Sequence, residues 1–220
     1  MVVFDWDNTL ADTWMIIFKS LERTFQKMDM IPMTFEEVTR GERGIHGSLR
    51  NSFPKIFGDK WQEAREHYYD SFKAVHLDEI KPIDGAENLL KALKNSEISM
   101  CVVSNKTGIY LREEVEHLGW SEYFISIVGA TDAKDDKPTH YPVALALEHS
   151  AVAFDMHNYQ EDIWMIGDSV TDLQTAKSSA IVGVLYGDNE EAKRMHFDGE
   201  IKHPIHIRNH DELLTLIGSS

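Results

Sequence analysis

The feature that most constrains this fold is the alternation of short apolar segments with segments of helical period. The apolar segments, which we expect to be strands, lie at residues 2–4, 98–103, 124–128, 163–166, 181–185 and 205–207. The segments of helical period between and after them cover residues 86–93, 110–118, 143–147, 173–178 and 211–217. Strands that alternate with helices form a parallel sheet with helices on both faces. The sequence therefore predicts an α/β fold.

One long stretch interrupts this alternation directly after the first predicted strand. It contains no convincing strand and has helical patterns at residues 14–28, 35–39 and 61–75. An insertion of this size predicts a second, helical domain. We place it at residues 14–80, within an α/β domain formed by residues 1–13 and 81–220.

The net charge narrows the possible partners. The chain has 37 acidic residues against 22 Lys and Arg, a formal charge of −15. Such a chain repels nucleic acid and anionic membranes, so an anionic substrate needs local positive charge from its site. The single cysteine, Cys101, lies in a predicted strand, where we expect a small core side chain. A single cysteine cannot form an internal disulfide, which indicates a reducing compartment. With no leader sequence and no apolar run of about 18 residues, we expect a cytoplasmic protein, either a monomer or a homodimer.

Polar clusters follow four of the predicted strands. They lie at residues 5–9, 104–106, 135–138 and 167–172. In an open parallel sheet, ligands bind beyond the carboxyl ends of the strands. We therefore expect these four clusters, which are distant in sequence, to form one site.

The residue types in these clusters suit phosphoryl transfer. Asp5 and Asp7, two apart on an extended chain, point the same way with backbones about 6.5–7 Å apart. Asp168 adds a third carboxylate, and such a group needs a cation, for which Mg²⁺ is the natural choice beside phosphate. Lys137 would add an ammonium and Ser104 a hydroxyl. Together they provide a nucleophile, an acid/base, a metal site and charge stabilisation.

The same residues resemble a known family. Phe4-Asp5-Trp6-Asp7-Asn8-Thr9-Leu10 is similar to the first motif of the haloacid dehalogenase (HAD) superfamily of phosphohydrolases. Ser104, Lys137-Pro138, and Gly167-Asp168-Ser169 with Asp172 match its other three motifs in order. The resemblance implies a three-layer, Rossmann-like core with a parallel sheet and an inserted α-helical cap domain. Phosphoglycolate phosphatases are the most similar members in overall layout.

The resemblance also implies roles for the acidic residues. Asp5 would attack phosphorus and become an aspartyl-phosphate. Asp7 would protonate the leaving oxygen and then activate water. Asp168 would hold Mg²⁺ together with Asp5 and the backbone carbonyl of Asp7. Asp172 would either belong to the metal site or orient the catalytic lysine.

The remaining motif residues would contact the phosphoryl group. Ser104 would donate a hydrogen bond to it, and Lys137 would neutralise both it and the nucleophile. Lys134 is the nearby alternative to Lys137. Thr9 and Asn105 would shape the phosphate-binding loop and donate backbone contacts.

Two positions refine the subclass. The carboxylate at Asp7 argues against carbon–halogen cleavage, because the dehalogenase branch of the family lacks it. Asn8 stands where the family usually has glycine, and Asn tolerates a left-handed backbone better than most residues. Trp6 is expected to point away from both carboxylates and to pack in the core.

The inserted helical segment contains an unusual stretch at residues 40–50, with three arginines, one histidine and three glycines. Arginine suits recognition of a carboxylate or a second phosphate. We expect this stretch to close over the active site, with Arg43, His46 and Arg50 determining substrate specificity. The alternative is a solvated surface loop.

Three functions are compatible with these observations. The first is a Mg²⁺-dependent phosphatase acting on a small phosphorylated metabolite, such as a phosphoglycolate-like compound or a sugar phosphate. The second is a phosphosugar mutase of the β-phosphoglucomutase type. The third is a non-enzymatic phospho-aspartate switch, which the second carboxylate at Asp7 disfavours because it enables rapid turnover.

Overall fold

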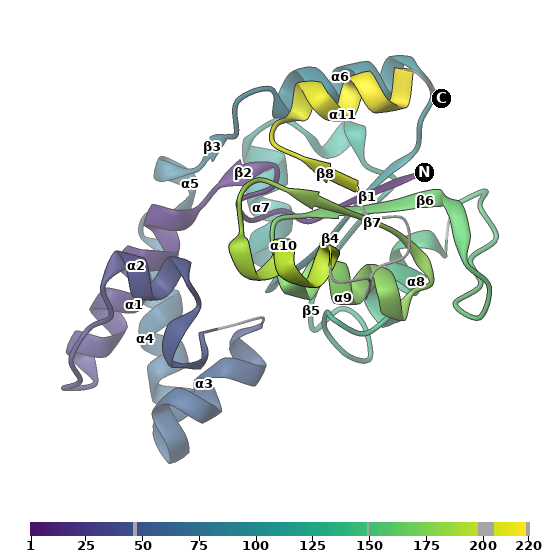
Figure 1. Cartoon of the computed structure of the whole chain (residues 1–220). Coiled ribbons are helices and arrows are strands. Elements are labelled where there is room, and N and C mark those ends of the chain that lie inside the picture. Colours follow the sequence, from purple (N-terminus) through teal and green to yellow (C-terminus); the bar gives the residue numbers. More distant parts are fainter. Residues whose placement is uncertain (46–47, 149, 198–204, 219–220) are drawn as a thin grey trace. The chain divides into compact units, whose positions relative to one another are not determined.

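The computed structural model describes residues 1–45, 48–148, 150–197 and 205–218 (Figure 1). The chain divides into two compact units. The α/β unit comprises Met1–Ala11 and Pro82–Ser220, and the helical unit comprises Asp12–Lys81. The boundaries expected from the sequence lie within two residues of these.

The α/β unit is built on a six-stranded sheet in the order β5-β4-β1-β6-β7-β8. The strands are β1 (Val2–Phe4), β4 (Met100–Thr107), β5 (Ser126–Ala130), β6 (Gln160–Gly167), β7 (Ile181–Tyr186) and β8 (Ile205–Ile207). Neighbouring strands are parallel throughout; Phe4, for example, is in register with Val102 on one side and Ile166 on the other. The predicted α/β fold with a parallel sheet is confirmed.

Helices cover both faces of this sheet, which explains the continuous apolar runs of its central strands. Helices α8 (Tyr141–Leu147) and α9 (Val170–Ser178) contribute to one core together with Val3, Cys101 and Val103. Helices α6 (Ala86–Asn95) and α11 (His210–Gly218) lie on the opposite side of the sheet (Figure 1). The remaining helices of this unit are α7 (Gly108–His117), α10 (Glu190–Phe197) and the short 3₁₀ turn Ser121–Tyr123.

The order of the strands creates the place for a site. The chain leaves β1, returns to its neighbour β4, and later crosses to β6 on the other side of β1. At such a reversal of strand order, the helices that follow β4 and β6 leave the sheet in different directions and open a crevice beyond the carboxyl ends of the strands. The ends of β1, β4 and β6 carry three of the four polar clusters.

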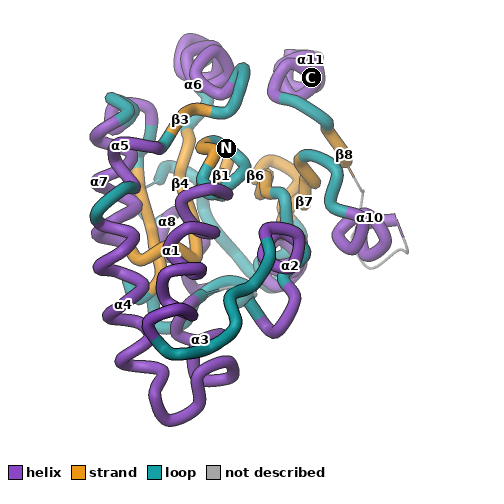
Figure 2. Tube along the Cα trace, turned by 90° about the vertical axis from the view of Figure 1, so that its left-hand side faces the viewer, coloured by secondary structure: helices purple, strands orange, loops and turns teal. Residues whose placement is uncertain are grey.

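The helical unit consists of helices joined by loops (Figure 2). Its helices are α1 (Trp14–Lys27), α2 (Phe35–Thr39), α3 (Leu49–Phe57), α4 (Trp61–Lys73) and α5 (His76–Glu79), with 3₁₀ turns at Glu42–Gly44 and Gly58–Lys60. Aromatic side chains form its core: the rings of Phe25 and Phe53 both pack on Phe57, at 5.1 and 5.0 Å between centroids. Helix α3 was not expected, because Pro54 lies inside it and the Gly-rich stretch precedes it.

The two crossings of the chain between the units form a small sheet of their own. Strand β2 (Ala11–Asp12) pairs with β3 (Lys81–Pro82). Among the described residues, no helix combines the length and the apolar character that crossing a lipid bilayer requires.

Candidate active site

Asp5 stands at the first position after β1 and continues the strand. Its N–H donates to the carbonyl of Ile166 on β6 at 2.8 Å, which fixes the backbone at the sheet edge. The residue is buried, with 7% of its surface exposed. The backbone that carries this carboxylate is therefore part of the hydrogen bonding of the sheet.

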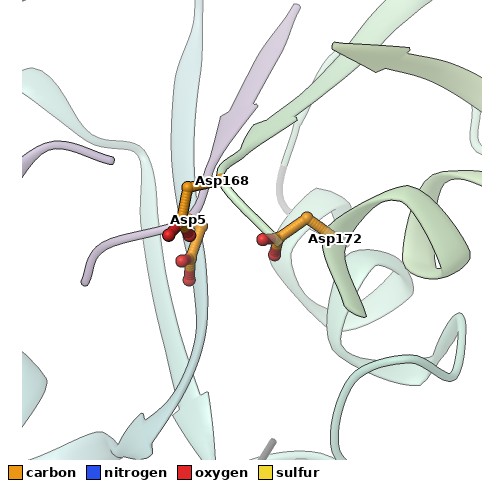
Figure 3. A group of neighbouring side chains, drawn as sticks. All are labelled: Asp5, Asp168 and Asp172. Atoms are coloured by element: carbon orange, nitrogen blue, oxygen red, sulfur yellow. The ribbon is translucent and has the colours of Figure 1, made fainter. Parts of the chain in front are cut away.

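Asp168 and Asp172 reach the same place from the end of β6 and the first turn of α9. One carboxylate oxygen from each of Asp5, Asp168 and Asp172 lies within 4.8 Å of the other two. Figure 3 shows Asp5 and Asp168 side by side and Asp172 pointing towards them from its helix. The expected convergence of remote acidic residues is therefore present in this fold.

Lys137 supplies the positive charge of this cluster. Its Nζ lies 2.6 Å from Asp5 Oδ1 and 2.6 Å from Asp172 Oδ1, and its side chain is 3% exposed. Burial alone lowers the pKa of Lys137, but the two carboxylates outweigh it and raise the pKa above its ordinary value. Lys134, the alternative lysine, instead donates to the hydroxyl of Tyr141 at 3.2 Å.

Asp172 is held on both of its oxygens. Ser169 Oγ and N–H donate to Oδ2 at 2.6 and 3.1 Å, in a capping box that starts α9. Lys137 Nζ donates to the other oxygen, Oδ1. Asp172 lies so close to the backbone of Gly167 that a Cβ added to this glycine would stand 2.2 Å from the Asp172 carboxyl carbon. Asp172 therefore contacts Lys137 and also belongs to the acidic group.

The acidic cluster carries more negative charge than Lys137 balances. Burial, and next the carboxylates nearby, outweigh the lysine and raise the pKa of Asp5 to about 7. Burial, followed by Asp172 and Asp5, also raises the pKa of Asp168 well above its ordinary value. Three carboxylates against one ammonium, with oxygen atoms as the only metal donors, fit a hard divalent cation such as Mg²⁺.

Asp7 is directed to a different lysine. The chain turns after it: Asn8 has φ 60°, and its N–H donates to the carbonyl of Ala11 at 2.7 Å. The left-handed backbone expected at Asn8 is thus present. Asp7 Oδ1 lies 2.6 Å from Nζ of Lys106, so its side chain is paired outside the group of three aspartates.

The other motif residues surround the cluster. Ser104, on β4, is 3% exposed and its Oγ accepts the N–H of Lys106 at 3.2 Å. Asn105 forms a reciprocal pair with the backbone of Lys137, accepting its N–H at 3.0 Å and donating to its carbonyl at 3.2 Å. Thr9 is fully buried and its N–H donates to the carbonyl of Trp6 at 3.3 Å. Asn105 and Thr9 therefore fix the loops that carry the charged groups.

The sequence reasoning placed Lys106 in the second polar cluster without giving it a role, and it missed Glu114. Lys106 Nζ lies 2.6 Å from Glu114 Oε2 on α7, and Trp6 Nε1 donates to the same oxygen at 2.7 Å. Trp6 is buried and packs edge-on against Trp120, as expected for a core residue. The available signal was Glu114 itself, a charged residue on the helix face that carries Leu111 and Val115.

Two of the three residues expected to determine specificity, Arg43 and Arg50, are described residues of the helical unit. Arg43 donates to Glu37 Oε1 from Nη2 at 2.8 Å and from Nε at 3.2 Å, and to the carbonyl of Ile31. Arg50 is exposed on α3. His46 lies outside the described residues. Arg43 is therefore tied to its own unit.

Known proteins are similar to this chain over most of its length. A phosphoglycolate phosphatase from Aquifex aeolicus is 29% identical over 181 residues, covering 80% of this chain and 79% of the relative. A 5'-nucleotidase from Pseudomonas aeruginosa is 28% identical, with 89% and 87% covered. The crystal structure of a predicted phosphatase from Clostridium acetobutylicum matches with a TM-score of 0.82 at 26% identity, covering 100% of this chain and 98% of the other. The family model for haloacid dehalogenase-like hydrolases matches residues 2–185, and the chain belongs to that family.

Proposed function

We propose that the protein is a Mg²⁺-dependent phosphatase that hydrolyses a small phosphomonoester through an aspartyl-phosphate on Asp5. The observation that carries the proposal is the position of Lys137, whose ammonium bridges Asp5 and Asp172 beside Asp168. The family is one of hydrolases, and relatives named phosphoglycolate phosphatase and 5'-nucleotidase act on phosphate esters.

Asp5 is the nucleophile. Lys137 pairs with Oδ1 of Asp5, and this contact directs the carboxylate and offsets the charge that gathers on the phosphoryl oxygens. Ser104, buried on the neighbouring strand, donates its hydroxyl to the phosphoryl group. The rigid sheet edge keeps these groups in place before the substrate arrives.

Asp7 is the general acid and base. It protonates the leaving oxygen as the ester bond breaks, and it then takes a proton from the water that attacks the aspartyl-phosphate. Its side chain pairs with Lys106 rather than with Lys137, so Asp7 lies outside the group of three aspartates that contains the nucleophile.

Asp5, Asp168 and the backbone carbonyl of Asp7 would hold Mg²⁺, with Asp172 at the edge of the site. When bound, this ion supplies positive charge that polarises the phosphoryl group and neutralises the acidic cluster. Thr9 and Asn105 contribute by fixing the loops that carry the charged residues.

The substrate is a small phosphorylated metabolite, for which phosphoglycolate and sugar phosphates are the first candidates. We also propose that Arg43, His46 and Arg50 govern which leaving group is accepted and that the helical unit serves as the cap. The buried thiol of Cys101 fits a reducing cytoplasm.

The test is a screen of small phosphomonoesters in which inorganic phosphate is measured with Mg²⁺ and with EDTA. Mg²⁺-dependent release from a subset of the esters is expected. Isomerisation of a sugar phosphate without phosphate release would establish a mutase instead. A single phosphorylation of the protein without turnover would establish a switch.

A further inference from the structure

A second buried ion cluster lies beside the first one. It consists of Lys106 at the end of β4, Asp7, Glu114 on α7 and Trp6, and we call it the Lys106 cluster. Lys106 Nζ lies 2.6 Å from Asp7 Oδ1 and 2.6 Å from Glu114 Oε2, and Trp6 Nε1 donates to Glu114 Oε2 at 2.7 Å. All four residues belong to the α/β unit.

Burying the charges of this cluster costs desolvation free energy, so stability alone does not account for it. Glu114 is fully buried and the side chain of Lys106 is 6% exposed. Buried ion pairs are often no more stabilising than apolar residues of the same size, because desolvation offsets their attraction. Lys106 Nζ lies between two carboxylates, Asp7 and Glu114, so the cluster pairs one lysine with two acidic side chains.

The contact with Asp7 distinguishes the two oxygens of that carboxylate. Oδ1 is buried, whereas the side chain as a whole is 20% exposed. The exposure therefore lies on the other atoms of the side chain. Lys106 Nζ lies against the buried oxygen, so in our account the proton is exchanged at the other oxygen, Oδ2.

We propose that Lys106 is a positioning residue that fixes Asp7 for proton transfer, and that Glu114 and Trp6 hold Lys106 in place. The inference rests on the proposed function, in which Asp7 is the general acid and base. The carboxylic acid of Asp7 gives its proton to the leaving oxygen as the P–O bond breaks and that oxygen keeps the electron pair. Lys106 stabilises the carboxylate left behind, which regains a proton from the attacking water.

Two substrates with different leaving groups test this role. The leaving group of p-nitrophenyl phosphate departs without protonation, whereas that of an alkyl phosphomonoester, such as phosphoglycolate, needs the proton of Asp7. Because kcat/KM reports the steps up to transfer onto Asp5, it isolates the acid role. Lys106→Met should lower kcat/KM for the alkyl ester by roughly 10- to 100-fold, less than the ~10²–10⁴-fold typical of losing the acid–base group itself, and for the aryl ester by less than about threefold.

Two further variants separate positioning from folding. Lys106→Met with Glu114→Gln removes both buried charges and keeps an acceptor for Trp6, so the melting temperature should recover while the alkyl-to-aryl ratio of kcat/KM stays low. In an Asp7→Asn background, Lys106→Met should lower this ratio no further, because the two residues act as one unit. Lys19→Met, which breaks a Lys–Glu pair of the helical unit, is the matched control and should leave the ratio unchanged.

The results separate the inference from the function on which it rests. Equal losses on both esters, an unchanged ratio, or a further fall in the Asp7→Asn background would overturn the positioning role while leaving the phosphatase intact. If the wild-type protein released phosphate from neither ester, the proposed function would fail and the role of Lys106 would fall with it.

Discussion

Two buried lysines, Lys137 and Lys106, stand in matching surroundings in the α/β unit. Each ammonium lies 2.6 Å from two carboxylates, Lys137 between Asp5 and Asp172, and Lys106 between Asp7 and Glu114. The clusters differ in what surrounds them. The first adjoins Asp168 and has the charge excess of a cation site, whereas the second is closed by Trp6 and Glu114 in the core.

The comparison explains how two aspartates only two residues apart can do different work. Asp5 continues the ladder of β1, whereas Asp7 lies at the turn that Asn8 permits with its positive φ. Each aspartate therefore meets its own lysine. In our account, the Lys137 cluster performs the chemistry at phosphorus and the Lys106 cluster performs the proton transfers.

The largest effect is expected at the nucleophile. Asp5→Asn should abolish turnover, because an amide is a poor nucleophile and loses its charge pairing with Lys137. Phosphate release is the measurement, with circular dichroism to verify the fold. A variant that kept more than a few per cent of wild-type turnover would contradict the separate roles of the two clusters.

Among the side chains of the two clusters, those of the first should determine metal affinity. Asp168→Asn removes one donor and should weaken Mg²⁺ binding by more than the roughly 10- to 100-fold typical of a partner outside the ligand shell. The measurement is the Mg²⁺ concentration at half-maximal activity. Glu114→Gln in the second cluster should leave that midpoint unchanged, and a similar shift in both variants would contradict the assignment.

Loss of the general acid should be severe but smaller than loss of the nucleophile. Asp7→Asn should slow turnover by about 10²–10⁴-fold, as is typical for acid–base groups, while Mg²⁺ binding is largely kept. Steady-state kinetics and the Mg²⁺ midpoint measure the two effects together. Full activity of this variant would show that the role of Asp7 is wrong.

The arginines of the helical unit should have moderate effects that depend on the substrate. Arg50→Ala or Arg43→Ala should raise KM or lower kcat for the physiological ester, with p-nitrophenyl phosphate barely affected. Since Arg43 pairs with Glu37, Glu37→Gln is the matched control. If Glu37→Gln reproduced the effect of Arg43→Ala, the arginine would act through its own unit and not through the substrate.

The smallest effect is expected at the buried thiol of Cys101. Burial raises the pKa of Cys101 to about 12, so only about one thiol in ten thousand is ionised at pH 8. Because the thiolate is the reactive form, iodoacetamide should label the native protein very slowly up to pH 8 and the unfolded protein quickly. Mass spectrometry measures the labelling, and rapid modification of the native protein would contradict a core position.

The fold was predictable because its signals are local. The apolar runs of the sheet strands are visible in the sequence, as are the polar clusters at the carboxyl ends of β1, β4 and β6 and in the loop after β5, and the rule for parallel sheets brings the clusters together. The bounds were less accurate: β4 extends to Thr107, and helices α3, α5 and α10 were not expected. Helix α5 has four residues, too few for a periodic pattern.

The pairing of charges was not predictable, because it depends on how separate elements pack. Asp172 could serve the metal or the lysine, and only its contacts with Lys137 and Ser169 show what each oxygen does. Lys106 follows Ser104 and Asn105 in the second motif, yet nothing in sequence joins it to Asp7. A charged residue on a buried helix face, as at Glu114, signals a partner without identifying it.

The most direct test of the central claim locates the phosphoryl group on the protein. The Asp7→Asn variant should form the aspartyl-phosphate from p-nitrophenyl phosphate without an acid and break it down slowly without a base, so the intermediate should accumulate. After rapid quenching with acid, borohydride reduces an acyl phosphate to an alcohol, and peptide mass spectrometry locates the change. We expect homoserine in place of aspartate at position 5. Reduction at another residue, or none while turnover continues, would contradict the account.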